Sequence, residues 1–186
     1  MKHWRPALLW TAVLAGGLGL WAGFSLGPRP SPLASPPAQP AIAVATPGQP
    51  LPPLRLTGLD GYQIELQQLQ GRPLLINVWA SWCAPCVEEM PELQRYADSQ
   101  GQQGVQVLGL ALDTPEQVAA FLQRVPVRYP IAIDTPGPAD ASVRLGNRQG
   151  LLPYTVLIDA DGVVGAQKLG PFAAGEIDAW VTSALP

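Results

Sequence analysis

Two almost continuous apolar runs dominate the pattern along this chain. Residues 74–79 read Leu-Leu-Ile-Asn-Val-Trp, and residues 105–112 form a second run of the same kind. A strand with one exposed face alternates apolar and polar residues, whereas an unbroken apolar run is typical of a strand that is buried on both faces. We therefore predict two buried strands, the first of them central in its sheet.

Helical periodicity follows the first run directly. From Pro85 the apolar positions repeat at intervals of three and four residues, which predicts a helix from 85 to about 99, with a kink at Pro91. The remaining pattern predicts a hairpin over 54–57 and 62–65, a helix capped by Thr114 and running to about 123, a strand over 129–133, a short helix over 139–145, a hairpin over 154–158 and 163–169, and a last helix over 173–185. This succession indicates an α/β domain with a mixed sheet flanked by helices.

The N-terminal residues have a different pattern. Residues 7–26 carry no charge, and Lys2, His3 and Arg5 precede them. A run of about twenty apolar residues is long enough to span a membrane, and basic residues before it favour a cytoplasmic N-terminus. We predict a signal-anchor helix over 1–27, with the rest of the chain on the far side. A cleaved signal peptide is the alternative, because small residues suited to cleavage follow between 32 and 45.

Residues 28–53 are rich in Pro, Ala and Ser, which predicts an extended, semi-stiff linker between the anchor and a single domain over 54–186. The chain has a formal net charge of −3 and no basic stripe, so nucleic acid is not expected as a partner. Its single histidine, His3, precedes the domain. The domain therefore lacks the imidazole that a Cys-His nucleophile pair or a common zinc site would need.

Cys83 and Cys86 lie where the first buried strand meets its helix. The helix macrodipole and the free amide groups of the first turn favour a thiolate at this place, so Cys83 is the expected nucleophile. Cys83 would form a mixed disulfide with a substrate, and Cys86 would attack Cys83 to release the reduced product. Pro85 is expected to fix the loop between the two cysteines.

Three other interpretations of the pair are a structural disulfide, half of a zinc site and two inert core thiols. A disulfide between these cysteines closes a loop of only a few residues and so adds little stability. A tetrahedral zinc site needs two further soft ligands, which the domain lacks, so no metal is expected. Inert thiols would leave Trp82 and Pro85 in this turn unexplained. Redox chemistry is therefore the favoured interpretation.

Residues 78–86, Val-Trp-Ala-Ser-Trp-Cys-Ala-Pro-Cys, resemble the active site of thioredoxin-like proteins of the TlpA and ResA type, which include the membrane-tethered thioredoxins of cytochrome c biogenesis. The resemblance runs from about residue 53 to the C-terminus and has a second landmark over 152–162. It implies a thioredoxin fold with an N-terminal hairpin extension, and no cofactor besides the redox-active disulfide. It also implies a cis proline at Pro153, with Trp82, Leu152 and Pro153 contacting the substrate.

Two polar residues carry further implications of this resemblance. Asn77 stands where thioredoxin has a buried aspartate, and an amide cannot shuttle a proton. Glu89 matches a glutamate that relatives place near the cysteines, where it would tune the thiols or accept a proton. The alternative for Glu89 is a solvated carboxylate on the helix surface. The family usually has Gly-x-Pro before the second landmark, whereas this chain reads Gly150-Leu151-Leu152-Pro153.

The resemblance implies a reductase in the bacterial cytoplasmic membrane, with its domain on the periplasmic side. A membrane thiol electron donor would recharge it, and its clients would be disulfide-containing proteins, such as apocytochrome c. We expect a reduction potential nearer to the value of about −270 mV for thioredoxin than to the value of about −120 mV for strong oxidants. One alternative is a peroxiredoxin-like thiol peroxidase, although Ala80 stands where that class needs Thr or Ser. Another is a copper-delivery module, which would pair its cysteines with a histidine.

Overall fold

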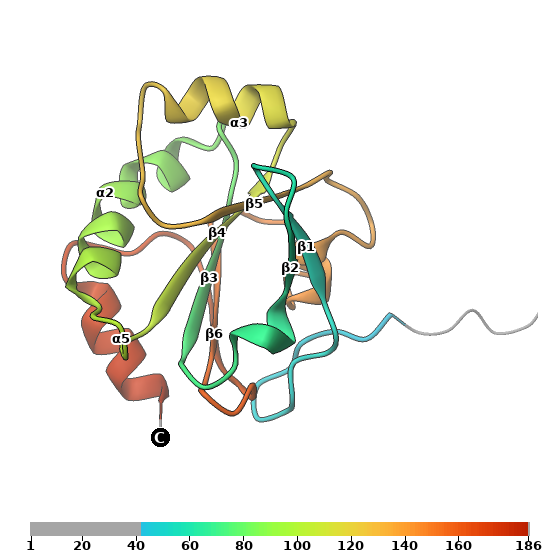
Figure 1. Cartoon of the computed structure of the whole chain (residues 1–186), viewed down its shortest axis with the longest axis vertical. Coiled ribbons are helices and arrows are strands. Elements are labelled where there is room, and N and C mark those ends of the chain that lie inside the picture. The colour runs from blue at the N-terminus through green and yellow to red at the C-terminus, as the bar shows by residue number, and fades with distance from the viewer. Residues whose placement is uncertain (1–41, 186) are drawn as a thin grey trace, which may run out of the picture. The chain divides into compact units, whose positions relative to one another are not determined.

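The computed structural model describes residues 42–185, and the predicted anchor and most of the predicted linker lie outside this range. The elements are β1 (Arg55–Gly58), β2 (Gln63–Glu65), the 3-10 helix η1 (Leu66–Leu69), β3 (Leu74–Trp79), α2 (Ala84–Ser99), β4 (Gln106–Leu112), α3 (Pro115–Leu122), β5 (Ile131–Asp134), α4 (Ala141–Arg144), β6 (Tyr154–Ile158), β7 (Val164–Leu169) and α5 (Glu176–Ala184) (Figure 1). Every strand and helix predicted within this range is present, while η1 was not predicted.

The strands form one mixed sheet in the order β2-β1-β5-β4-β3-β6-β7. Strand β3 pairs in parallel with β4 and antiparallel with β6, and β4 pairs in parallel with β5. The predicted hairpin of β1 and β2 is antiparallel and extends the sheet at the edge formed by β5. The predicted α/β class and thioredoxin fold with a hairpin extension are confirmed.

Both faces of the sheet are covered, as the apolar run of β3 predicts. All six residues of β3 are buried. One face, including Leu75 and Trp79, packs in a cluster with residues of α2, α3 and α5. The other face, including Ile76 and Val78, packs in a second cluster that contains residues of α4 and η1. Helices α2 and α5 lie together on the first face (Figure 1).

Two helices differ in detail from the sequence pattern. Helix α2 continues through Pro91 to Ser99, so this proline does not end it, and the kink stays a prediction. Helix α5 begins at Glu176 rather than at 173, because Gly175 has a φ of 76°, which an α-helix does not accommodate. The prediction for the start of this last helix was therefore wrong by three residues.

The end of the predicted linker packs on the domain, and we call residues 42–53 the docked segment. Its backbone donates hydrogen bonds from Ala45 to the carbonyl of Arg144 (2.7 Å) and from Gly48 to the carbonyl of Val164 (2.8 Å). Ala45 is buried in the second cluster. The predicted boundary at residue 54 is thus too late, because non-proline residues between the prolines keep N–H groups that find acceptors on the domain.

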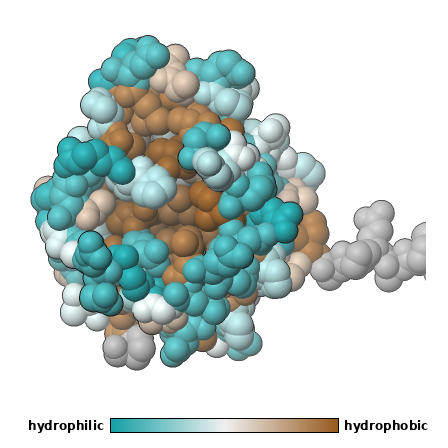
Figure 2. Space-filling view, viewed as in Figure 1, coloured by the Kyte–Doolittle hydropathy of each residue, from teal (hydrophilic) through white to brown (hydrophobic). Residues whose placement is uncertain are grey.

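Within residues 42–185 no helix has the length and apolar character needed to cross a membrane, and the predicted anchor over 1–27 is outside the described range. Figure 2 shows apolar side chains in the middle of one face of the molecule, with hydrophilic side chains around them. Leu59, Val125 and Val127 are only partly buried against the first cluster, so parts of this core reach the surface.

Candidate active site: the Cys83–Cys86 pair

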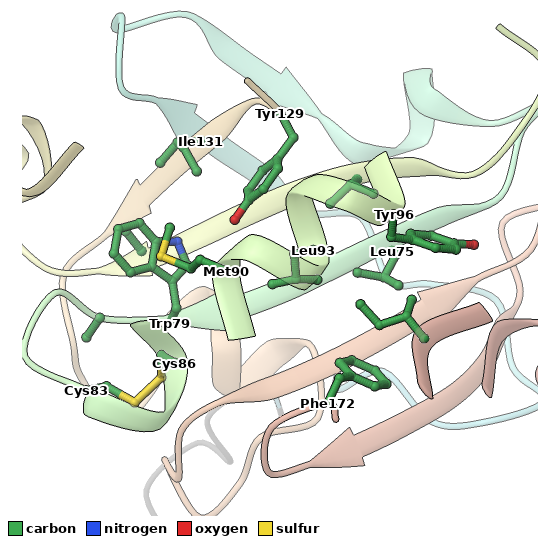
Figure 3. Packing of buried hydrophobic residues seen from close by; sticks show 14 of the residues in the cluster. Leu75, Trp79, Cys83, Cys86, Met90, Leu93, Tyr96, Tyr129, Ile131 and Phe172 are labelled. Atoms are coloured by element: carbon green, nitrogen blue, oxygen red, sulfur yellow. A yellow bond between two sulfur atoms is a disulfide. The ribbon is translucent and has the colours of Figure 1, made fainter. Parts of the chain in front are cut away.

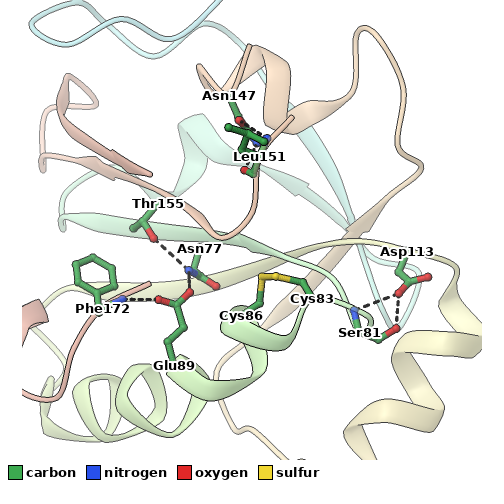
Figure 4. The surroundings of a disulfide bond; sticks show 10 residues. All are labelled: Asn77, Ser81, Cys83, Cys86, Glu89, Asp113, Asn147, Leu151, Thr155 and Phe172. Atoms are coloured by element: carbon green, nitrogen blue, oxygen red, sulfur yellow. Dashed lines mark hydrogen bonds between the residues drawn. A yellow bond between two sulfur atoms is a disulfide. The ribbon is translucent and has the colours of Figure 1, made fainter. Parts of the chain in front are cut away.

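The turn after β3 places the two cysteines at the tip of α2. The N–H of Cys83 donates to the carbonyl of Ala80 (3.1 Å), and the carbonyl of Cys83 accepts from the N–H of Val87 (3.1 Å). Cys83 is therefore the N-cap residue of α2, as the sequence predicts, and Cys86 lies in the first turn. The two residues form a disulfide with their Cα atoms 5.3 Å apart (Figure 4).

The two sulfur-bearing residues differ in access to solvent. Cys83 keeps 6% of its surface exposed and Cys86 none, while the neighbouring Trp82 is 69% exposed. The disulfide lies at one end of the first apolar cluster, near Trp79 and Met90 (Figure 3). Of the two cysteines, only Cys83 therefore keeps any surface in contact with solvent.

Pro85 is the second residue of α2. A proline fits this position because the first N–H groups of a helix have no partner within the helix, so the missing donor costs nothing there. The remaining free amides of the first turn are directed toward the end of the helix at which Cys83 stands. This is the electropositive setting that stabilises a thiolate.

Glu89 and Asn77 form a buried polar group behind Cys86 (Figure 4). Asn77 donates from Nδ2 to Oε1 of Glu89 (2.8 Å) and to Oγ1 of Thr155 (3.1 Å). The N–H of Phe172, in the loop before α5, donates to Oε2 of Glu89 (2.8 Å). Glu89 is only 2% exposed. The alternative of a solvated surface carboxylate is therefore wrong.

Burial sets the proton affinity of Glu89. Desolvation raises the pKa of this carboxyl above its ordinary value of 4.5, and it outweighs the hydrogen bonds from Phe172 and Asn77, which lower it. The positive charge of Lys168 lowers this pKa further, and the negative charge of Glu176 raises it. Lys168 is held by Glu176 (3.1 Å) and lies over the Phe172 ring. A carboxyl with a raised pKa can take up and return a proton closer to neutral pH.

The peptide bond between Leu152 and Pro153 is cis, which confirms the prediction. Strand β6 pairs antiparallel with β3 so that Tyr154 lies opposite Val78. Pro153 therefore reaches the level of Trp79, at the end of β3 from which the cysteine turn begins. Leu152 is partly buried and packs against the cluster that contains both cysteines.

The sequence pattern did not single out Asp113, Ser81 or Thr155 near this site. Asp113 accepts two hydrogen bonds from Ser81 (Figure 4). A polar residue directly after a buried parallel strand was the available signal for Asp113. Thr155 lies opposite Asn77 in the sheet, and no sequence pattern specifies that register. Among residues 42–185 there is no group of three His, Cys, Asp or Glu side chains that could hold a metal ion.

A disulfide at a helix N-terminus, on a mixed sheet with a cis proline at the adjacent strand, defines a thiol-disulfide oxidoreductase with a thioredoxin fold. Residues 46–181 match the Redoxin family, and the chain belongs to this family and to its TlpA and ResA type. The thiol-disulfide oxidoreductase ResA of Geobacillus kaustophilus is 31% identical over 147 residues, which are 78% of this chain and 80% of the relative.

Two solved structures extend this likeness. The thioredoxin-related protein of Neisseria meningitidis serogroup B is 32% identical with a TM-score of 0.62, and the match covers 69% of this chain and 97% of that structure. A thiol:disulfide interchange protein of the thioredoxin family from Chlorobium tepidum is 27% identical with a TM-score of 0.62, and the match covers 76% and 99%. The activity class of this protein is therefore disulfide oxidoreduction.

Proposed function

We propose that this protein is an extracytoplasmic reductase that transfers electrons from Cys83 and Cys86 to disulfides of client proteins. The observation that carries the proposal is the disulfide at the N-terminus of α2, in which Cys83 keeps a small exposed surface and Cys86 is fully buried. The two thiols of the reduced pair supply both electrons and become the disulfide, so the proposed reaction needs no cofactor.

In the reduced protein the Cys83 thiolate attacks one sulfur of the client disulfide. A bond forms between Cys83 and the client, and the second client sulfur leaves as a thiolate, which takes up a proton. Cys86 then loses its proton, for which Glu89, one helical turn further along α2, is the proposed acceptor. The Cys86 thiolate attacks Cys83 and releases the other client sulfur as a thiolate, which takes up a proton to become a thiol. Two electrons have passed to the client, and the protein holds the disulfide.

We place the client chain beside Leu152 and Pro153. Within the described part of the chain, the backbone N–H and carbonyl of Leu152 have no hydrogen-bond partner, so both are free to pair with an extended segment. The exposed ring of Trp82 offers an apolar contact next to Cys83. These three residues are the proposed substrate contacts.

The location is proposed from the uncharged apolar run over 7–26, which suits a single membrane anchor with the domain outside the cytoplasm. An anchored reductase there would take electrons from a membrane thiol donor, and apocytochrome c is the proposed client class. In fractionated cells the full chain should sediment with membranes and be digested by protease added from the periplasmic side. A chain found in the cytosol would contradict this location.

A trapping experiment tests the mechanism. Cys86→Ser removes the sulfur that resolves the mixed disulfide, so clients should remain bound to Cys83 and be recovered as complexes that a reducing agent releases. The matched control is Cys83→Ser, which keeps the buried cysteine and should trap far less. Equal trapping by both variants, or none by Cys86→Ser, would refute Cys83 as the nucleophile.

A further inference from the structure

The carboxylate of Asp113 is hydrogen-bonded to the turn that carries Cys83. Asp113 directly follows β4 and is only 8% exposed. Its Oδ2 accepts from the N–H of Ser81 (3.2 Å) and from the hydroxyl of Ser81 (2.5 Å). Its Oδ1 accepts from the N–H of Thr114 (3.0 Å). Three donors thus hold the carboxylate at the carboxyl end of β4, beside the end of β3.

Ser81 is the residue through which Asp113 acts on the redox pair. It lies inside the turn that the hydrogen bond from Cys83 to Ala80 closes. This turn decides where α2 begins and therefore where the sulfur of Cys83 stands. Because both donors of Ser81 bind one oxygen of Asp113, the turn cannot shift without breaking two hydrogen bonds at a buried carboxylate.

The charge of Asp113 has a second consequence. Cys83 is two residues from Ser81, so their Cα atoms are at most about 7 Å apart. In Figure 4 Asp113 lies on the Cys83 side of the disulfide and Glu89 on the Cys86 side. Two further charged residues, Glu88 of α2 and Arg124 after α3, line a hollow together with Ser81 and Trp82. Because Asp113 is hydrogen-bonded to Ser81, its negative charge lies beside the turn and opposes the thiolate that the helix N-terminus favours.

We propose that Asp113 is a positioning residue of the redox centre, which holds the Cys83 turn through Ser81 and keeps the cysteine pair reducing by its charge. This inference rests on the proposed function, because it concerns the same pair. Destabilising the Cys83 thiolate destabilises the reduced state, so electrons pass more readily to a client.

The test compares Asp113→Asn with Asp161→Asn in the full chain. Asn keeps an oxygen that can accept from Ser81 but removes the charge. Asp161 is exposed in the hairpin between β6 and β7, near Ile158, which pairs with Leu74 at the opposite end of β3. Asp113→Asn should raise the acid dissociation constant of the Cys83 thiol roughly tenfold, measured by thiolate absorbance, and should shift the glutathione equilibrium toward the reduced protein. Asp161→Asn should change neither.

Ser81→Ala provides a second test, which also holds if Asp113→Asn does not fold. It keeps the charge and removes one hydrogen bond to the turn, so attack of the Cys83 thiolate on oxidised glutathione should slow several-fold. An unchanged rate in Ser81→Ala, or equal Cys83 acidity in Asp113→Asn and Asp161→Asn, would overturn the inference. A wild-type protein that exchanges no disulfide would overturn the proposed function instead.

Discussion

At the scale of single residues, two carboxyls on opposite sides of the disulfide differ in their surroundings. Asp113 accepts three hydrogen bonds and stays attached to the turn. Glu89 accepts one hydrogen bond at each oxygen, but it is only 2% exposed, and desolvation dominates its pKa. The first arrangement holds the turn through hydrogen bonds, and the second gives a buried carboxyl with a raised pKa.

The raised pKa of Glu89 predicts how stability depends on pH. The folded protein holds this proton more tightly than the unfolded chain, so the contribution of Glu89 to the free energy of unfolding is fully present below its ordinary pKa of 4.5. It is lost as the pH rises through the raised value. Glu89→Gln cannot lose a proton, so its stability relative to the wild type should increase as the pH rises.

Urea unfolding of the oxidised proteins between about pH 4 and about pH 8 measures this difference. Gln at position 89 can accept only one of the two hydrogen bonds, which lowers the free energy of unfolding by the same amount at every pH. The charge of Glu89 instead changes how steeply the free energy of unfolding of the wild type depends on pH. Glu88→Gln is the matched control, since Glu88 is the exposed neighbour on the same helix. Parallel curves for the wild type and Glu89→Gln would show that Glu89 does not titrate in this way.

At the scale of elements, the packing of β3, β4 and α2 decides what surrounds the redox pair. Gly109 of β4 pairs with Asn77 of β3. A Cβ atom at Gly109 would lie 2.6 Å from Cδ1 of Ile131 and 3.1 Å from both Nε1 of Trp79 and Cε2 of Tyr129. Because Gly109 has no side chain, the side chains of these three large residues can pack closely over β4.

Gly109→Ala should destabilise the protein by about 1–3 kcal/mol, because the added methyl group overpacks a closed core. The midpoint of urea unfolding measures the loss. Gly101→Ala is the control, since a Cβ there meets no atom within 4 Å and the backbone is not in the left-handed region. Equal midpoints for the two variants would mean that the core around Trp79 accommodates the added methyl group without loss of stability.

At the scale of the whole molecule, the docked segment links the N-terminal region to the domain. Its hydrogen bonds reach the last residue of α4, the start of β7 and the turn between β6 and β7, including one from Leu51 to the carbonyl of Gly162 (2.9 Å). These contacts lie on the face of the sheet that α2 does not cover. The docked segment is therefore part of the second hydrophobic core of the domain.

Shortened chains test this contribution. A chain of residues 42–186 should unfold at the same urea concentration as the corresponding domain of the full protein. A chain of residues 54–186 loses four main-chain hydrogen bonds to the rest of the domain. Ala45, Gly48 and Leu51 donate three of them, and Gln49 accepts the fourth from Val164. Each is worth roughly 1 kcal/mol, so this chain should be less stable by about 4 kcal/mol. Equal stability of the two chains would show that the docked segment contributes nothing.

Local patterns in the sequence determined much of this protein. The apolar runs predicted β3 and β4, and Cys83 and Cys86 at the junction of strand and helix predicted the redox pair, because strand burial, helix initiation and thiol chemistry depend on residues close together in the chain. Pro153 was predicted as cis from resemblance rather than from local physics.

Only the tertiary structure decided which distant residues meet. Phe172 and Asn77 donate hydrogen bonds to the buried Glu89. Asp113 accepts hydrogen bonds from Ser81, and the docked segment is hydrogen-bonded to β7. These contacts follow from strand order and register, which place residues far apart in the chain side by side. Strand order and register are set by the packing of the whole domain, so no short stretch of sequence encodes them.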